Sequence, residues 1–218
     1  MAQINLTLLV IVLSLFVSSV LVKSSLAKHN PQTKSYIESS CNGTLYQDLC
    51  IRCLAKYVNN YSTIDGPHHL AQVALSVSFS RALHTKGYLM KLAKELKTMK
   101  NKREYLTVED CANQITDSVD QLNQAIKELS RCSQRGSTIN DDLLWHISNV
   151  ETWVSTALTD ASSCVYSLTG IRMSKRMTAI KVKAQNVAEV TSNALALFRR
   201  YALSSQKSTS RTTKNSLP

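Results

Sequence analysis

Three cysteines lie within thirteen residues near the start of the chain, in the stretch CNGTLYQDLCIRC, and the last two form a C-x2-C pair. Cysteines at this spacing bind zinc or undergo redox chemistry in reducing compartments, whereas oxidising compartments favour disulfides. A zinc site needs further ligands at suitable spacing, and none of the five histidines forms such a pattern with Cys50 and Cys53. The sequence therefore predicts no metal site and no cofactor.

The N-terminus indicates which compartment applies. Residues 4–22 are almost wholly apolar, and small residues stand at the −3 and −1 positions of a cleavage site after Ala27. This pattern predicts a signal peptide over residues 1–27, with the secreted chain beginning at or near Lys28. An uncleaved membrane anchor is the alternative, because a run of nineteen residues approaches the length of a membrane span. No other stretch is long and apolar enough, so the secreted chain is predicted to have no stable membrane anchor.

The composition favours long helices and an anionic partner. Only five glycines and three prolines occur in 218 residues, which argues against a fold with many turns. The formal net charge is +11, and such an excess favours partners of opposite charge. Nucleic acid is excluded as a partner outside the cell, so an acidic polysaccharide or an acidic protein is the expected class.

Four long segments with helical periodicity follow the cysteine-rich start, at about residues 65–97, 107–130, 140–168 and 177–203. Asp65-Gly66-Pro67 places proline in the first turn of the first helix, and Thr107 with Asp110 has the spacing of a capping box at the start of the second. Short connections between four amphipathic helices predict an all-α fold, an up-down-up-down bundle. The apolar positions expected to pack the first helix are Leu70, Val73, Ala74, Val77, Leu83, Leu89, Leu92 and Leu96.

The remaining segments complete the predicted domain organisation. Residues 28–64 are expected to form an N-terminal helical hairpin, and residues 65–204 the bundle. Residues 205–218 are rich in Ser, Thr, Lys and Arg and are expected to be a disordered basic tail.

The bundle topology brings two distant cysteines together. Cys111 and Cys164 are almost equidistant from the expected turn near residues 136–137, so they should lie at the same height on two antiparallel helices. A disulfide there could link the helices, and Cys41 with Cys50 could similarly close the hairpin. Cys53 and Cys132 are left over, either free or paired with each other.

Four stretches, in order, resemble the plant invertase and pectin methylesterase inhibitor family: CNGTLYQDLC, EDCANQITDSVDQL, ISNVETWVSTALTDASSC and EVTSNALALF. The third is similar to the most distinctive segment of that family. The resemblance covers about residues 33–203 and departs from the family pattern at Gln47, where proline is usual. It departs again at Tyr166 and Leu168, where the family has Asp and Phe.

The resemblance implies disulfides Cys41–Cys50 and Cys111–Cys164, a four-helix bundle preceded by a hairpin, and a non-catalytic role. Family members block pectin methylesterases or acid invertases of the cell wall and vacuole by occupying the active-site cleft. An extracellular location in the apoplast or cell wall follows. Positions that match the face which contacts methylesterase are Asn113, Asp117, Ser118, Asp120 and Thr159.

Other interpretations are weaker. The motifs of hydrolases, zinc proteases and phosphate-binding loops are absent from the sequence, which argues against an enzyme and predicts no catalytic residues. A non-inhibitory basic protein that binds acidic pectin is a further alternative, because lysines recur every three residues from Lys91 to Lys100. Acid invertase is the alternative target. Invertase inhibitors of the family often carry a Pro-Lys-Phe tripeptide in the bundle, which this sequence lacks. Its absence and the acidic residues of the second bundle helix favour pectin methylesterase as the target.

Two glycosylation sequons are present, and they begin at Asn42 and Asn60.

Overall fold

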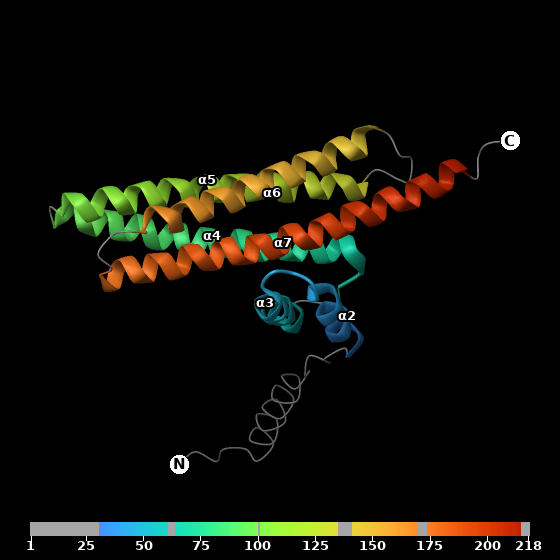
Figure 1. Ribbon diagram of the computed structural model, residues 1–218, viewed down its shortest axis with the longest axis horizontal. Coiled ribbons are helices and arrows are strands. Elements are labelled where there is room, and N and C mark those ends of the chain that lie inside the picture. The colour runs from blue at the N-terminus through green and yellow to red at the C-terminus, as the bar shows by residue number, and fades with distance from the viewer. Residues whose placement is uncertain (1–30, 61–63, 100, 135–140, 170–173, 215–218) are drawn as a thin grey trace, which may run out of the picture.

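The computed structural model describes residues 31–60, 64–99, 101–134, 141–169 and 174–214. These residues form six α-helices and contain no β-strand (Figure 1), so the all-α prediction is confirmed. The helices are α2 Pro31–Cys41, α3 Gln47–Asn60, α4 Gly66–Thr98, α5 Lys102–Gln134, α6 Asp141–Ser167 and α7 Lys175–Lys214. The predicted signal peptide lies outside the described residues.

Helices α4 to α7 form the predicted up-down-up-down bundle (Figure 1), and α4 and α6 each pack against both α5 and α7. The core consists of the faces that follow helical periodicity. The buried residues at helical spacing are Val150, Val154, Ala157, Ala161, Cys164 and Leu168 in and just after α6, and Ile180, Ala184, Val187, Val190, Ala194, Leu197 and Tyr201 in α7. Amphipathic patterning therefore decides which face of each of these helices turns inward.

The prediction for α4 is wrong at Leu83, and Val77 is only half-buried. The Leu83 side chain is 48% exposed, whereas the neighbouring Ala82 is fully buried. The buried face continues at spacings of four and three through Ser78, Ala82, Thr85 and Leu89, and two of these residues are polar. Their hydroxyl groups donate to carbonyl oxygens one turn earlier, Ser78 to Ala74 at 3.1 Å and Thr85 to Arg81 at 2.9 Å. Burial therefore leaves neither hydroxyl unpaired.

The start of α5 also differs from the prediction. The helix begins at Lys102, and Thr107 lies inside it, with its hydroxyl donating to the Arg103 carbonyl at 3.3 Å. Asn101 caps the helix, since its Oδ1 accepts the Glu104 backbone N–H at 3.3 Å. Asparagine is as good an N-cap as serine or threonine, and the capping-box spacing at Thr107 was coincidental.

The described backbone of the predicted basic tail, residues 205–214, continues as helix, because α7 runs to Lys214. No proline or glycine interrupts residues 204–214, and a helix already nucleated by packing propagates readily into such a sequence. The Ser204 and Ser205 hydroxyls donate to the Tyr201 carbonyl at 2.7 and 3.1 Å.

Helices α2 and α3 form the predicted hairpin, which packs beside α4 and α7 (Figure 1). The hairpin is closed by the Cys41–Cys50 disulfide, with the two Cα atoms 5.8 Å apart. Helix α3 begins at Gln47, where a first-turn proline would be favourable. The residue at which the chain departs from the family pattern is therefore the first residue of a helix. Glutamine can also occupy this position.

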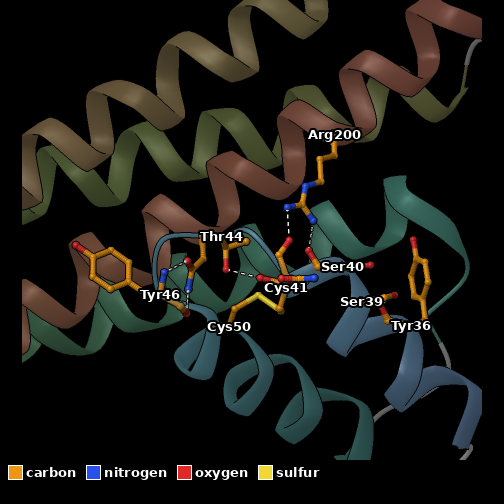
Figure 2. The surroundings of a disulfide bond; sticks show 10 residues. Tyr36, Ser39, Ser40, Cys41, Thr44, Tyr46, Cys50 and Arg200 are labelled. Carbon is orange, nitrogen blue, oxygen red and sulfur yellow. Dashed lines mark hydrogen bonds between the residues drawn. A yellow bond between two sulfur atoms is a disulfide. The ribbon is translucent and has the colours of Figure 1, made fainter.

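The turn between α2 and α3 is fixed to α7 by side chains that bond its backbone. The Arg200 guanidinium donates to the carbonyls of Ser40 and Asn42 (Figure 2), the latter at 2.6 Å. One turn of the hairpin further on, Asn193 donates to the Tyr46 carbonyl at 2.9 Å and accepts the Tyr46 N–H at 3.2 Å. These contacts join segments about 150 residues apart and position the hairpin on the bundle.

Candidate target-binding face

Helices α5 and α6 are joined by the second predicted disulfide, Cys111–Cys164, with Cα atoms 4.6 Å apart. Seven residues along each helix from these cysteines, the Ser118 hydroxyl donates to the Ala157 carbonyl at 3.0 Å. The two contacts have the same antiparallel register and set both the height and the rotation of α6 against α5. The surface formed by this helix pair is consequently a fixed one.

Four of the five residues matched to the methylesterase-contacting face lie on the surface of this pair. Asn113, Asp117 and Asp120 are exposed at i, i+4 and i+7 of α5, a spacing that places them on one stripe. Thr159 is exposed on α6. Ser118 is fully buried, so the expectation that it faces a target is wrong. Its hydroxyl serves the α5–α6 contact instead, because position 118 falls on the inward face between Ile115 and Leu122.

Polar residues that the sequence reasoning missed lie between the stripe and the core. The Oε1 atoms of Gln114 and Gln121 and the Oδ2 atom of Asp160 are buried and have no hydrogen-bond partner among the described residues. Both glutamines immediately precede seam positions, Ile115 and Leu122. A polar residue repeated at a seven-residue spacing beside the seam is the signal that would have identified them.

Asp160 belongs electrostatically to the stripe on α5. Burial raises the pKa of the Asp160 carboxyl, and the nearby charge of Asp117 raises it further. Two carboxyl groups from different helices thus influence each other across the α5–α6 surface. The result is a locally acidic surface on a protein whose net charge is strongly positive.

A shallow groove of about 500 Å³ runs along the outer side of α6 and is lined mainly by hydroxyl groups. Its lining residues are Ser148, Glu151, Thr152, Ser155, Thr156 and Thr159. The threonine hydroxyls donate to carbonyls one turn earlier, as Thr159 does to Ser155 at 3.0 Å. Their oxygens keep lone pairs that can accept hydrogen bonds from a partner. Glu151 is held in place by Arg199 of α7, with Oε1 2.7 Å from Nε.

The two departures from the family pattern at the end of α6 have different environments. The Tyr166 side chain is 78% exposed, whereas Leu168 is 1% exposed and belongs to the core. Leucine for phenylalanine is therefore a change of core packing. Tyrosine for aspartate changes the outer surface two residues beyond the Cys111–Cys164 bridge and replaces a charge with an aromatic ring.

A buried ion-pair network lies at the opposite end of the α5–α6 pair. The Glu128 side chain accepts hydrogen bonds from Arg131 at 2.6 Å, His146 Nδ1 at 2.6 Å and Asn149 at 3.2 Å. Burial by itself would raise the pKa of Glu128, but these three donors outweigh it and lower the pKa. All of its partners are structural, so the network stabilises the ends of α5 and α6.

The two remaining cysteines form no disulfide, which decides between the two alternatives left open by the sequence. Cys132 is buried on α5, and burial, with the charge of Glu128 adding to it, raises its pKa to about 11. A thiol in this state is unreactive. Cys53 is half-buried on α3. Over the described ranges no three His, Cys, Asp or Glu side chains gather into a metal-binding cluster, and no helix there is long and apolar enough to cross a membrane.

The two sequons differ in what the structure describes. Asn42 is exposed in the turn between α2 and α3, but Thr44 of the same sequon is buried, and its hydroxyl donates to the Cys41 carbonyl at 2.8 Å (Figure 2). Asn60 is the last residue of α3, and its sequon continues outside the described residues. Glycosylation at Asn42 or Asn60 stays a prediction.

The fold and this face define a class: all-α proteins in which a disulfide-closed hairpin precedes a four-helix bundle whose polar face is fixed by a second disulfide. Residues 35–197 match the family described as plant invertase/pectin methylesterase inhibitor. The chain belongs to this family. Since the family consists of protein inhibitors of enzymes, the prediction that the chain is not an enzyme is confirmed.

Relatives support the same assignment. Pectinesterase inhibitor 9 of Arabidopsis thaliana is 38% identical over 201 residues, which cover 91% of this chain and 94% of the relative. Pectinesterase inhibitor 11 of the same plant is 36% identical over 77% of this chain and 81% of its own length. A crystal structure of a pectin methylesterase inhibitor from Arabidopsis thaliana matches with a TM-score of 0.51. It is 16% identical and covers 76% of this chain and 95% of its own, a likeness that shows the fold.

Proposed function

We propose that the protein inhibits pectin methylesterase by placing the α5–α6 face in the active-site cleft of the enzyme. Similar relatives are named pectinesterase inhibitors, which supports this target over acid invertase. The observation that carries the proposed binding mode is the exposed stripe of Asn113, Asp117 and Asp120, fixed beside Thr159 by the Cys111–Cys164 bridge.

The physical basis is a polar surface that is already ordered before binding. A cleft that accepts a sugar chain is long and polar, and the stripe presents carboxylates and an amide that can bond to its donors. Because the disulfide and the Ser118–Ala157 contact fix α5 against α6, little conformational entropy is lost on binding.

The test is to remove the two carboxylates of the stripe. Replacing Asp117 and Asp120 together by Ala should weaken inhibition about tenfold or more, because contacts at the centre of an interface carry most of its energy. Helicity and melting temperature should stay nearly unchanged, since exposed substitutions usually alter stability by less than about 0.5 kcal/mol. The matched control is the double variant Asp48→Ala with Asp65→Ala, which removes two exposed carboxylates elsewhere and should inhibit normally.

Target choice is tested by titrating the protein against pectin methylesterase and acid invertase in parallel at mildly acidic pH. Inhibition of methylesterase alone is expected. Inhibition of invertase alone would assign the other target of the family, and inhibition of neither would mean that the fold serves another purpose here.

Tyr166 provides a finer test of the same surface. If the exposed ring weakens the fit of the α6 end, Tyr166→Asp should strengthen inhibition by restoring the family residue. Tyr166→Phe is the matched control, because it keeps the ring and adds no charge. Equal inhibition by all three forms would place residue 166 outside the interface.

We also propose that the protein acts outside the cell, in the cell wall, after removal of residues 1–27. N-terminal sequencing of protein secreted by plant cells should begin at or near Lys28, whereas an intact Met1 would indicate a membrane-anchored form. Association with acidic pectin is part of this proposal, because the net charge of +11 favours an anionic polymer. Salt should then elute the protein from isolated walls.

A further inference from the structure

Helices α3 and α4 border a second groove, of about 710 Å³, on a different part of the molecule from the α5–α6 face. It lies where the hairpin packs beside the bundle (Figure 1). Its volume falls in the range of about 300–1,000 Å³ that is typical of ligand sites. The groove is lined by Leu49, Arg52, Cys53, Lys56, Tyr57, Ser76, Val77, Ser80, Arg81 and His84.

Positive charge converges on this groove from both helices. Arg52 and Lys56 are one turn apart on α3, and Arg81 lies on α4, all three with exposed side chains. Within the described part of the chain none of the three has a carboxylate within ion-pair distance, and no lining residue is acidic. Like charges at i and i+4 destabilise a helix slightly. A bound anion would relieve that repulsion and give each cation a partner.

The rest of the lining is suited to a sugar rather than to a bare ion. Leu49, Val77 and the half-buried Tyr57 provide apolar surface for the C–H faces of a sugar ring. Ser76 and Ser80 lie beside it. The Ser76 hydroxyl donates to the Gln72 carbonyl at 2.8 Å, which leaves its oxygen able to accept a bond from a sugar hydroxyl. His84 is oriented by a 2.7 Å hydrogen bond between Nδ1 and the Ser80 carbonyl.

The groove is preformed, because the elements on both sides are fixed independently of any ligand. The Cys41–Cys50 bridge fixes α3 against α2, and the Asn193 contacts with Tyr46 fix the hairpin to α7 of the bundle. Rigid placement matters here, since the planar guanidinium groups of Arg52 and Arg81 bind carboxylates through two parallel N–H donors only when they are well oriented.

We propose that the α3–α4 groove binds a carboxylated sugar chain, with Arg52, Lys56 and Arg81 holding successive carboxylates and Tyr57 packing against a ring. Only the choice of de-esterified pectin as the source of that chain rests on the proposed function. Because the groove is separate from the α5–α6 face, the protein could hold the polysaccharide product of a methylesterase while inhibiting the enzyme.

The first experiment measures binding of the full secreted chain to a de-esterified pectin oligomer by calorimetric titration, without any enzyme. The triple variant Arg52→Gln, Lys56→Gln, Arg81→Gln should bind the oligomer at least about tenfold more weakly. This is the loss expected when three charge-assisted contacts are removed. The matched control is Lys91→Gln, Lys94→Gln, Lys97→Gln, which removes three exposed charges of α4 outside the groove. It should change the affinity by less than about threefold, as screened surface charges do.

Two further ligands test the chemical class. The same oligomer with methyl-esterified carboxyls keeps the sugar rings but loses the charge, and it should not bind measurably. A polyphosphate of equal charge keeps the charge but lacks the rings, and it should bind more weakly than the de-esterified oligomer. Equal binding of polyphosphate, or equal loss in the two triple variants, would reduce the groove to a diffuse basic surface and overturn the proposal.

Cys53 provides a local reporter, because it lines the groove and forms no disulfide. The de-esterified oligomer should slow labelling of Cys53 by a maleimide several-fold, while labelling of the buried Cys132 stays as slow as before. Unprotected Cys53 in protein saturated with oligomer would place the ligand elsewhere.

The proposed groove and the proposed inhibitory face are separated by measuring methylesterase inhibition with the triple groove variant. This variant should lose oligomer binding and inhibit the enzyme as well as the natural chain does. Loss of inhibition in parallel with binding would overturn the independence of the groove from the α5–α6 face.

Discussion

The hairpin and the bundle are each closed by one disulfide, but different interactions hold them together. In the bundle, continuous apolar seams on four helices decide the packing, and Cys111–Cys164 links helices that already meet along their length. The hairpin contributes few residues to the core and is placed by hydrogen bonds from Arg200 and Asn193 to its backbone (Figure 2). The bundle is thus stabilised mainly by burial and the hairpin by directional contacts.

The loops closed by the two disulfides reflect this difference. The bridged residues are 9 positions apart in the hairpin and 53 apart in the bundle. On the chain-entropy model, closing such loops contributes about 3 and about 4 kcal/mol respectively. The hairpin disulfide makes the smaller contribution to stability, but the hairpin depends on it more. A two-helix unit of this size buries little apolar surface and has little core of its own.

The largest expected effect comes from breaking the bridge of the bundle. Cys111→Ser should lower the free energy of unfolding by roughly 2–5 kcal/mol, as loss of a native disulfide does in small secreted domains. Denaturant unfolding followed by circular dichroism measures the change. Cys53→Ser is the matched control, because Cys53 forms no disulfide, and should leave the midpoint nearly unchanged. A similar loss in both variants would assign the effect to cysteine replacement in general.

The next effect concerns the placement of the hairpin. Asn193→Ala removes both side-chain hydrogen bonds to Tyr46 and leaves the Tyr46 N–H without its partner, so it should cost about 1–3 kcal/mol. Hydrogen exchange should then speed up in α2 and α3 but not in α5 and α6, because only the hairpin loses contacts. The same substitution at Asn186, also on α7, is the control. Uniformly faster exchange over the whole chain would contradict the separate placement of the hairpin.

Two glycines allow one substitution to be compared in both regions. Gly43, in the hairpin turn, has φ +80°, and an added Cβ would lie 3.2 Å from the Arg200 guanidinium, so Gly43→Ala should destabilise by about 1–2 kcal/mol. Gly87 is in the middle of α4 with open space around the added Cβ. Gly87→Ala should therefore stabilise by about 0.5–1 kcal/mol. Opposite shifts of melting temperature are expected, and shifts of the same sign would contradict this assignment.

The smallest effect is a pH dependence in the bundle. Because the pKa of Asp160 is raised in the folded state, the folded protein binds this proton more readily than the unfolded chain does. Stability is therefore lost as pH rises through the folded pKa and is regained below the ordinary value of 3.8. Asp160→Asn should raise the melting temperature at neutral pH by an amount worth less than about 1 kcal/mol, since water screens a half-buried group.

The advantage of Asp160→Asn over the natural chain should disappear below that pH. Asp120→Asn, an exposed carboxylate on the same face, is the control and should show a smaller difference at neutral pH. An advantage that persists at all pH values would point to packing rather than to charge.

Much of the fold could be predicted from the sequence, because helical periodicity and cysteine spacing can be measured directly along the chain. The seams of α6 and α7, the antiparallel order of the bundle and both disulfides follow from spacing along the chain and from the family resemblance. The family resemblance also indicated Asn113, Asp117 and Asp120, which the structure places on one exposed stripe of α5. The prediction was wrong at Leu83, where small and polar residues continue the buried face of α4 and apolar content alone is misleading.

Only the tertiary structure decided which polar groups meet across helices. Ser118 turns inward to the Ala157 carbonyl, Asp160 lies near Asp117, and Arg200 reaches the backbone of Asn42 from 158 positions away. Arg52 and Arg81 likewise line one groove only because the hairpin packs beside α4. The physical reason is that apolar burial depends on which face a residue occupies, which periodicity encodes. A hydrogen bond or a charge interaction depends on the distance between two particular atoms, and that distance exists only after the helices have packed.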